Sequence, residues 1–259
     1  CWEKQALTAK ADHILLLAGT SEARQLAGTL AETFPESRLS ASFAGAVRDL
    51  PDLGVPTRVG GFGGTKGLLA FMRHEGITVI VDATHPFAAQ MSRNAAEAAK
   101  MLKVPLVRLE RPCWHPGEAD AWTNVLSMDD AAEALPDGAR AFLAIGRKEI
   151  ERFTHRNDIL GLVRMIEPPK TRLPSAWELI LSRPPASADE EVSLFLEKNI
   201  THVVTKNSGG SRSYAKIEAA RTLKLPVIMI ARPELPEAET APTNSALVDR
   251  LRQILARGS

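Results

Sequence analysis

The chain has 259 residues, and its 32 Lys and Arg balance 31 Asp and Glu to a net charge of +1, which argues against a nucleic-acid partner. A content of 44% hydrophobic and 24% charged residues is typical of a globular protein that works in water. Two cysteines and six scattered histidines give no metal-type spacing, and no apolar run approaches the length of a membrane span. We therefore expect a cytoplasmic protein without a metal, built as one large domain or two smaller ones.

The first half begins with an extension, followed by a strand, a tight turn and a helix. Residues 1–12 lack the charged start and apolar middle of a signal peptide, so we expect them to be an extension or disordered. The apolar run over residues 14–18 predicts a strand, and the apolar spacing after residue 22 predicts a helix. Further strands are predicted at 38–45, 55–59, 77–83 and 105–109, and helices at 65–74 and 87–102.

The second half repeats this alternation. Strands are predicted at 141–145, 159–166, 178–181, 202–205 and 227–230, and helices just after residue 147 and at 190–197, 214–223 and 247–255. Apolar strands without period-two alternation, separated by helices, indicate parallel sheets covered on both faces. Because Pro112, Pro116 and Gly117 interrupt the pattern, we expect two α/β domains, residues 13–115 and 116–259.

Two segments of the chain are alike. Residues 98–112 read AAKMLKVPLVRLERP, and residues 219–233 read AARTLKLPVIMIARP, a shift of 121 residues. The same shift places Thr84 on Thr205, each at the end of a predicted strand. The repeat predicts two related halves with function between them.

Glycine-rich turns follow two strands of the first half. Gly19 opens the turn after the first strand, where Thr20 and Ser21 could bind phosphate or merely cap the helix. Only one glycine of the dinucleotide fingerprint is present there. Four glycines lie within residues 60–64, which we call the glycine loop. That loop favours close approach of the backbone to a flat or phosphorylated ligand over a simple turn.

Basic and polar residues lie near the other strand ends. Arg48 follows the second strand, where an Arg can accommodate the 2′-phosphate of NADPH, or it is a surface charge. His85 lies between Thr84 and Pro86 and could donate a proton or simply bond backbone, and Pro86 suits the start of a helix.

Residues 206–210, Lys-Asn-Ser-Gly-Gly, form what we call the lysine loop. The loop combines a cation, an amide, a hydroxyl and a helix N-terminus, which suits an anionic ligand better than mere capping does. Arg147 follows a strand on the same predicted edge and could clamp a carboxylate.

Together GTSEARQLA, GGFGG, DATHPFAAQMS, RLERPCW and VVTKNSGG…YAKIEAA resemble the precorrin-6A reductases of cobalamin biosynthesis, including the cobalt-precorrin-6A enzymes. The resemblance spans residues 13–235, with motifs of both halves in the family's order. It implies NADPH-dependent reduction of one C=C bond of a polycarboxylate macrocycle, giving precorrin-6B or its cobalt form. It also implies two Rossmann-like parallel-sheet domains with the active site in a cleft between them.

The resemblance assigns roles to the motif residues. Its cofactor side comprises Gly19, Thr20, Ser21, Glu22, Gly61, Phe62, Gly63, Thr84 and Pro86, with Arg48 as the candidate for the 2′-phosphate. Its substrate side comprises Arg147, Lys206, Asn207, Ser208, Gly209 and Gly210. The candidates for a catalytic role are His85 and Lys206, with water as a third source of the proton.

One departure from the family concerns Arg48. The family pattern has Arg directly after the Ala-Gly of the second strand, whereas here Ala44-Gly45 is followed by Ala46-Val47 and then Arg48.

Two alternative functions stay open. One is a reductase of another tetrapyrrole, and the other is a non-catalytic module that binds a nucleotide or a tetrapyrrole.

Overall fold

The computed structural model describes residues 11–43, 54–185 and 187–258. The chain forms two compact units, Cys1–Arg111 with Glu234–Ser259, and Pro112–Pro233. This differs from the expected domains at 13–115 and 116–259, because the segment from Glu234 onward returns to the first unit. Arg48 and most of the expected extension lie outside the described residues.

The first unit is a six-stranded sheet with the order β12-β5-β4-β1-β2-β3, and every neighbouring pair is parallel. Its strands are β1 (His13–Ala18), β2 (Arg38–Phe43), β3 (Thr57–Val59), β4 (Val79–Ala83), β5 (Leu106–Leu109) and β12 (Glu239–Ala241). Its helices are α1 (Ser21–Thr33), α2 (Gly64–Glu75), α3 (Ala89–Leu102) and α7 (Asn244–Gly258). The order is that of a doubly wound dinucleotide-binding fold.

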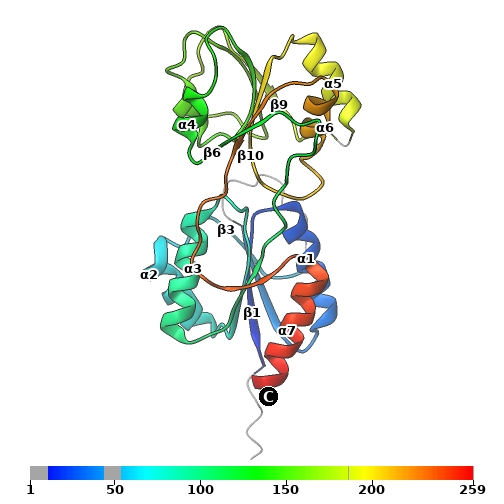
Figure 1. The fold of residues 1–259 in the computed structure, drawn as a ribbon. Helices are drawn as coiled ribbons and strands as arrows, with labels where there is room; N and C mark the ends of the chain where they lie inside the picture. The colour runs from blue at the N-terminus through cyan, green and yellow to red at the C-terminus, as the bar shows by residue number, and fades with distance from the viewer. Residues whose placement is uncertain (1–10, 44–53, 186, 259) are drawn as a thin grey trace, which may run out of the picture. The chain divides into compact units, whose positions relative to one another are not determined.

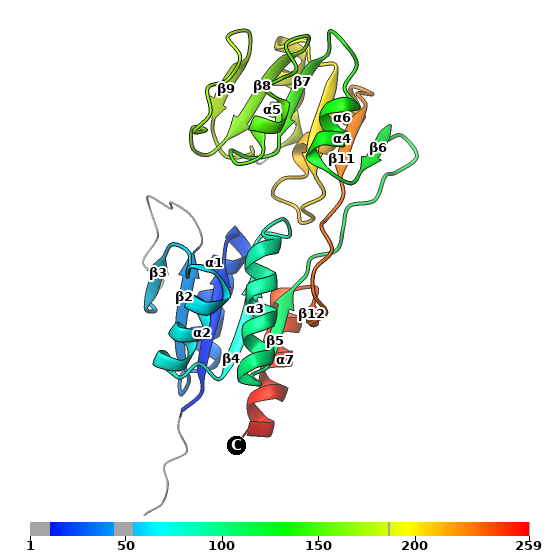
Figure 2. The ribbon, with the colours of Figure 1, turned by 90° about the vertical axis from the view of Figure 1, so that its left-hand side faces the viewer.

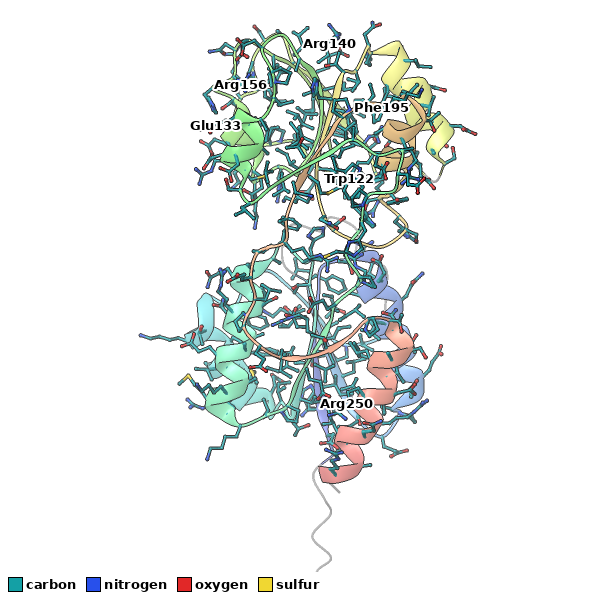
Figure 3. All side chains as sticks on the ribbon, viewed as in Figure 1. Trp122, Glu133, Arg140, Arg156, Phe195 and Arg250 are labelled. Atoms are coloured by element: carbon teal, nitrogen blue, oxygen red, sulfur yellow. The ribbon has the colours of Figure 1, made fainter. Side chains whose placement is uncertain are left out.

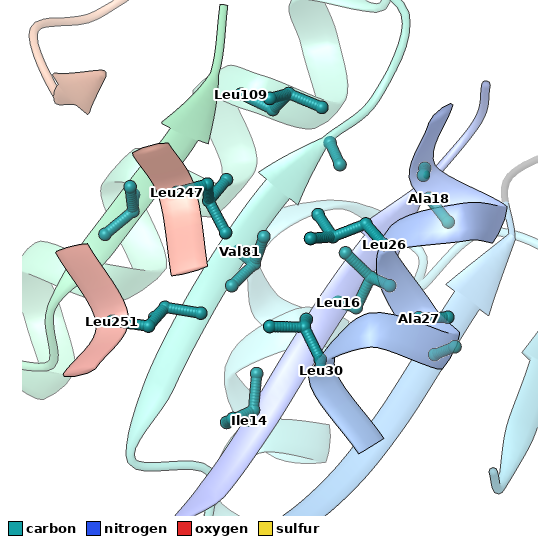
Figure 4. Packing of buried hydrophobic residues seen from close by; sticks show 14 of the residues in the cluster. Ile14, Leu16, Ala18, Leu26, Ala27, Leu30, Val81, Leu109, Leu247 and Leu251 are labelled. Atoms are coloured by element: carbon teal, nitrogen blue, oxygen red, sulfur yellow. The ribbon is translucent and has the colours of Figure 1, made fainter. Parts of the chain in front are cut away.

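Strand β1 lies in the centre of this sheet, and both of its faces are buried. Ile14 and Leu16 pack with α1 and α7, and the alternate residues Leu15 and Leu17 pack with α2 and α3. Figure 4 shows the first of these two layers, and Figures 1 and 2 show α7 beside α1 and α2 beside α3. A continuous apolar strand is therefore required, since no residue of β1 faces water.

The C-terminal segment completes the first unit. Strand β12 pairs with β5, and Leu247 and Leu251 of α7 are fully buried against the same core as Leu26. The amphipathic spacing predicts the helix, but it carries no information about which of two similar sheets the helix covers.

The second unit has the sheet order β6-β11-β10-β7-β8-β9, again parallel throughout. Its strands are β6 (Trp122–Val125), β7 (Arg140–Ala144), β8 (Leu160–Met165), β9 (Glu178–Leu181), β10 (His202–Lys206) and β11 (Val227–Ile230). Its helices are α4 (Met128–Glu133), the 3-10 helix η1 (Ile150–Phe153), α5 (Ala188–Glu197) and α6 (Ala215–Thr222). Phe142 of β7 packs on Phe195 of α5, with ring centroids 4.9 Å apart; Figure 3 labels Phe195.

The two sheets have the same strand order, except that the edge strand comes from a different position in the chain. The edge strand beside β5 is β12, which comes last in the chain, whereas the strand beside β11 is β6, which precedes the rest of its unit. The pattern did not predict β6, α4 or β12. Each is short, and the exposed Thr123 and Asn124 in the middle of β6 leave it without an apolar run.

Strand register corrects one detail of the repeat. Leu106 and Val227 are 121 residues apart, and they pair with Ile80 and Val203, which are 123 residues apart. Thr84 therefore corresponds to Asn207, and Asp82 rather than Thr84 corresponds to Thr205. The second half is two residues shorter between these strands, which a constant shift cannot express.

Candidate functional site

In the first unit the chain runs outward from β1 to β3 and returns to β4, so the strand order reverses between β1 and β4. Ligands of such sheets bind beyond the carboxyl ends of the strands at this point. Gly19 is exposed there, and a Cβ on it would lie 3.4 Å from the backbone N of His85 and 3.6 Å from Cα of Thr84. The structure thus brings together two loops that are far apart in sequence and leaves bare backbone where they meet.

The turn after β1 is the start of α1. Thr20 is the N-cap, and its hydroxyl accepts a hydrogen bond from the backbone N of Ala23 at 3.1 Å. Of the two roles open to this hydroxyl, the structure therefore has it capping the helix. Glu22 lies in the first turn and forms an ion pair with Arg111 at 2.8 Å, so its charge is compensated. The positive end of the helix dipole at this turn suits an anion.

The glycine loop has a defined shape. Gly60, Gly63 and Gly64 have φ values of 106°, 79° and 82°, in the left-handed region where a side chain is strained. Phe62 packs on Phe71 of α2 with ring centroids 5.1 Å apart. Across the loop, the guanidinium of Arg58 lies 4.8 Å from the Phe62 ring centroid and donates to the carbonyl of Gly61 at 2.7 Å. These contacts hold the loop in place, and the sequence reading missed Arg58 because it is an exposed residue of a short edge strand.

Thr84, His85 and Pro86 follow β4. Thr84 is buried, and its N–H and hydroxyl both donate to Asp82 Oδ1, at 3.2 and 2.7 Å. His85 Nδ1 accepts from the backbone N of Phe87 at 3.2 Å, so in the neutral ring the proton resides on Nε2. Pro86 is not the first helical residue as expected. A turn closed by the N–H of Ala88 on the carbonyl of His85 precedes α3.

A buried ion pair holds Asp82, the acceptor of both hydrogen bonds from Thr84, in place. Asp82 and Arg108 have side chains only 1% and 6% exposed, and Arg108 Nε lies 3.3 Å from Asp82 Oδ2. Arg108 also donates to the carbonyl of Pro236, and its Nη2 is buried without a partner among the described residues. The carboxylate that orients Thr84 is thus held by a cation from the neighbouring strand.

The second unit reverses its strand order between β7 and β10, the equivalent point. Gly146 follows β7 with φ 87°, and a Cβ on it would lie 4.0 Å from Lys206 Nζ. Burial lowers the pKa of Lys206, Glu149 opposes that shift and Lys148 adds to it. A cation with a lowered pKa therefore lies where a ligand of this unit is expected.

Arg147 follows Gly146 in the chain and already has a partner. Its Nη1 is 2.5 Å from Glu167 Oε2, just past β8, and both side chains are partly exposed. A carboxylate ligand would share the guanidinium with Glu167 or replace it.

The other side chains of the lysine loop are hydrogen-bonded to residues of the second unit outside the loop. The side chain of Asn207 accepts from the backbone N of Trp114 at 2.8 Å and donates to the Trp114 carbonyl at 3.0 Å. The hydroxyl of Ser208 is 3.1 Å from that of Ser213. Gly209 and Gly210 have φ values of 65° and 76°, which explains both glycines by conformation. The amide and hydroxyl predicted to bind a ligand thus also shape the loop around Lys206.

Lys216 is buried behind this loop. Its Nζ donates to the carbonyl of Ser213 at 2.5 Å and lies 5.1 Å from the Trp114 ring centroid. Burial lowers the pKa of Lys216 to about 8, with Glu191 of α5 opposing the shift and Arg164 of β8 adding to it.

This pKa makes stability depend on pH. Between about pH 8 and the ordinary value of 10.5, the unfolded chain binds a proton at Lys216 that the folded chain has lost, so folding becomes more favourable as pH rises. We expect the urea midpoint of the wild type to rise relative to that of Lys216→Met across this window. A constant difference between pH 7 and pH 10 would contradict the prediction.

Within the described residues, no helix is long and apolar enough to cross a membrane. In the same part of the chain, no three His, Cys, Asp or Glu side chains gather as a metal would require.

In each unit we call the place where the strand order reverses the switch point; it lies between β1 and β4 in the first unit and between β7 and β10 in the second. The family model of precorrin-6x reductase CbiJ/CobK matches residues 13–255. The chain belongs to this family. The precorrin-6A reductase of Rhodococcus erythropolis is 48% identical over 228 residues, which cover 87% of this chain and 91% of the relative. The cobalt-precorrin-6A reductase of Priestia megaterium is 32% identical over 235 residues, which cover 86% and 91%.

A solved structure described as CobK precorrin-6A reductase matches with a TM-score of 0.86 and 39% identity, covering 94% of this chain and 97% of that one. This likeness confirms the predicted fold of two parallel α/β sheets for this chain. The motifs quoted from both halves therefore identified the family correctly.

Proposed function

We propose that this chain reduces one C=C bond of precorrin-6A with NADPH, giving precorrin-6B. The observation that carries the proposal is the family match over residues 13–255, which includes the switch points of both units. The greater identity to a precorrin-6A reductase, 48% against 32% for a cobalt-precorrin-6A reductase, favours the metal-free substrate.

The first unit fits a dinucleotide. The strand order has its reversal at β1 and β4, Gly19 leaves a space that a Cβ would enter, and α1 offers a helix N-terminus beside it. The residues that would hold NADPH are Gly19, Thr20, Ser21 and Glu22 at the turn, Gly61, Phe62 and Gly63 in the glycine loop, and Thr84 and Pro86 after β4. When bound, NADPH supplies the hydride.

The second unit suits the substrate, which carries many carboxylates. Lys206 and Arg147 offer cations there, and Asn207, Ser208, Gly209 and Gly210 continue the chain directly after Lys206. A cation freed from water pairs more strongly with a carboxylate than an exposed one does. We assign Lys206, together with Arg147, the role of binding a carboxylate.

The reduction also needs one proton on the carbon next to the one that receives hydride. His85 carries its proton on Nε2 in the neutral tautomer, and the burial that lowers the pKa of Lys206 makes its ammonium a better acid. Both are candidates, and variants of each separate them. If His85 is the donor, its loss lowers kcat and leaves the KM for precorrin-6A unchanged, and loss of Lys206 raises only that KM. If Lys206 is the donor, its loss lowers kcat as well.

The test is anaerobic incubation of the full chain with NADPH and either precorrin-6A or cobalt-precorrin-6A, following nicotinamide absorbance. We expect oxidation of one NADPH per precorrin-6A, and a product heavier by two hydrogens. Oxidation only with another tetrapyrrole would move the substrate assignment. Binding of both ligands without oxidation would favour the non-catalytic alternative.

Gly19→Ala tests the cofactor assignment. An added methyl group meets only ordinary contacts at 3.4 Å, so the fold should tolerate it, but it occupies the bare backbone at the switch point. We expect the dissociation constant of NADPH to rise by about tenfold or more with little change in Tm. Gly28→Ala, in the helix α1 that follows Gly19 and with nothing near its Cβ, is the matched control. Equal NADPH affinity in the two variants would exclude Gly19 from the cofactor site.

A further inference from the structure

The chain passes between the units twice, and an Arg-Pro pair stands at each passage. Arg111-Pro112 spans the first boundary, and Arg232-Pro233 ends the second unit. The two pairs are the last residues of the internal repeat, 121 residues apart. The proposed function gives these arginines no role.

Arg232 holds the lysine loop at one point. Its Nε donates to the carbonyl of Asn207 at 2.9 Å, and its Nη2 donates to the carbonyl of Pro112 at 3.3 Å. The N–H of Asn207 donates to the carbonyl of Ile230 at 2.9 Å, and its side chain is bonded to Trp114. The residue that follows Lys206 is thus tied to both passages, and Trp114 Nε1 ties Gly210 as well, at 3.0 Å.

Arg111 holds the turn after β1 in the first unit. Its Nη1 donates to Glu22 Oε1 at 2.8 Å, and the two side chains are 15% and 24% exposed. The guanidinium offsets the negative charge that Glu22 brings to the N-terminus of α1, the end of the helix that suits an anionic ligand. On the same unit, the second passage is fixed by Arg93 and Arg108, which donate to the carbonyls of Glu234 and Pro236.

We propose that Arg111 and Arg232 are equivalent positioning residues, each of which ties a passage between the units to one binding loop of its own unit. The proposal rests on the proposed function, because it takes the turn after β1 as the cofactor side and the lysine loop as the substrate side. Each guanidinium contacts its loop and not the ligand. Each arginine therefore sets the affinity for one ligand only.

The experiment measures binding of NADPH and of precorrin-6A to the full chain by calorimetry, alongside KM and kcat. Arg111→Ala should weaken NADPH binding by about tenfold and leave precorrin-6A binding unchanged. Arg232→Ala should do the reverse. Arg232→Lys should recover part of the precorrin-6A affinity, because Lys can reach one carbonyl but cannot hold two as a planar fork does.

Arg221→Ala is the matched control. Arg221 belongs to the second unit and pairs with buried Asp120 through two bonds of 2.9 Å, so its loss lowers stability without touching either loop. It should leave both affinities unchanged.

Trp114→Phe keeps a ring but loses the bond to Gly210, and should weaken precorrin-6A binding even if Arg232→Ala fails to fold. Equal weakening of both ligands in either arginine variant, or no weakening, would overturn the proposal. Binding constants report on the arginines whether or not the wild type oxidises NADPH, so a failure of the proposed function is seen separately.

Discussion

Lys206→Ala lowers kcat/KM for precorrin-6A by on the order of 10- to 100-fold and leaves the dissociation constant of NADPH nearly unchanged. The expected loss is that of one charge-assisted hydrogen bond to a carboxylate in a partly desolvated place. NADPH affinity should persist because the residues assigned to it belong to the other unit. Steady-state kinetics with precorrin-6A and calorimetry with NADPH measure the two quantities.

The pH dependence of KM identifies the ammonium as the group responsible. Burial holds the pKa of Lys206 below 10.5, so the cation is lost as pH rises through that lowered value, and KM for precorrin-6A should rise there. Lys206→Ala should lack this limb, and Lys206→Arg should keep a low KM at high pH. Lys148→Ala should move the limb to higher pH, since Lys148 contributes to the lowering while Glu149 opposes it.

Equal losses of NADPH and precorrin-6A affinity in Lys206→Ala would contradict the division of roles between the units. A KM that stays flat up to pH 10.5 in the wild type would remove Lys206 from carboxylate binding. A pH limb that persists in Lys206→Ala would assign the titration to another group.

The fold was predictable because parallel sheets buried on both faces demand continuous apolar strands. Ile14 to Leu17 illustrate this, since alternate residues serve different helix layers and none is exposed. Strand β12 and helix α7 were harder. The amphipathic spacing specifies helix α7, but the short β12 has no comparable pattern. The sequence also does not choose between the two sheets, because each offers a similar edge, beside β5 or beside β11.

The candidate site was predictable where a residue type has few other uses. Glycines with φ near 65° to 106° and a lysine at a strand end are visible in the sequence. The partners were not, because Trp114 bonds Asn207 from 93 positions away and Arg111 reaches Glu22 from 89 positions away. Strand register adds a correspondence that the repeat alone missed. Leu15 pairs with Ile80 in the first unit, and Phe142 pairs with Val203 in the second. Leu15 and Phe142 are 127 residues apart, so Gly19 corresponds to Gly146.

That correspondence supports the proposal that the two units bind different ligands. Glu149 falls on Glu22, and Arg147 falls on Thr20, which caps α1 through its hydroxyl. In the second unit the same place carries a guanidinium paired with Glu167. A cation in the second unit thus occupies the position that a capping hydroxyl occupies in the first. A helix N-terminus suits phosphate, whereas a guanidinium suits a carboxylate.

Asp82→Ala destabilises the first unit by about 3–5 kcal/mol, because it leaves the buried Arg108 without its countercharge. The change also removes the acceptor of both hydrogen bonds from Thr84, so His85 loses its fixed backbone. Urea unfolding followed by far-ultraviolet circular dichroism measures the loss. Three of the four tryptophans, Trp114, Trp122 and Trp177, belong to the second unit, so tryptophan fluorescence should shift far less.

The double variant Asp82→Ala with Arg108→Met separates charge from packing. Met removes the uncompensated guanidinium, so the pair of changes should cost less than Asp82→Ala alone, even though the bond to Pro236 is lost as well. Asp249→Ala breaks the exposed pair with Arg252 in the same unit and should change stability little. If the double variant is less stable than Asp82→Ala, the contacts of Arg108, including its bond to Pro236, contribute more than its uncompensated charge costs, and the buried charge does not account for the loss in Asp82→Ala.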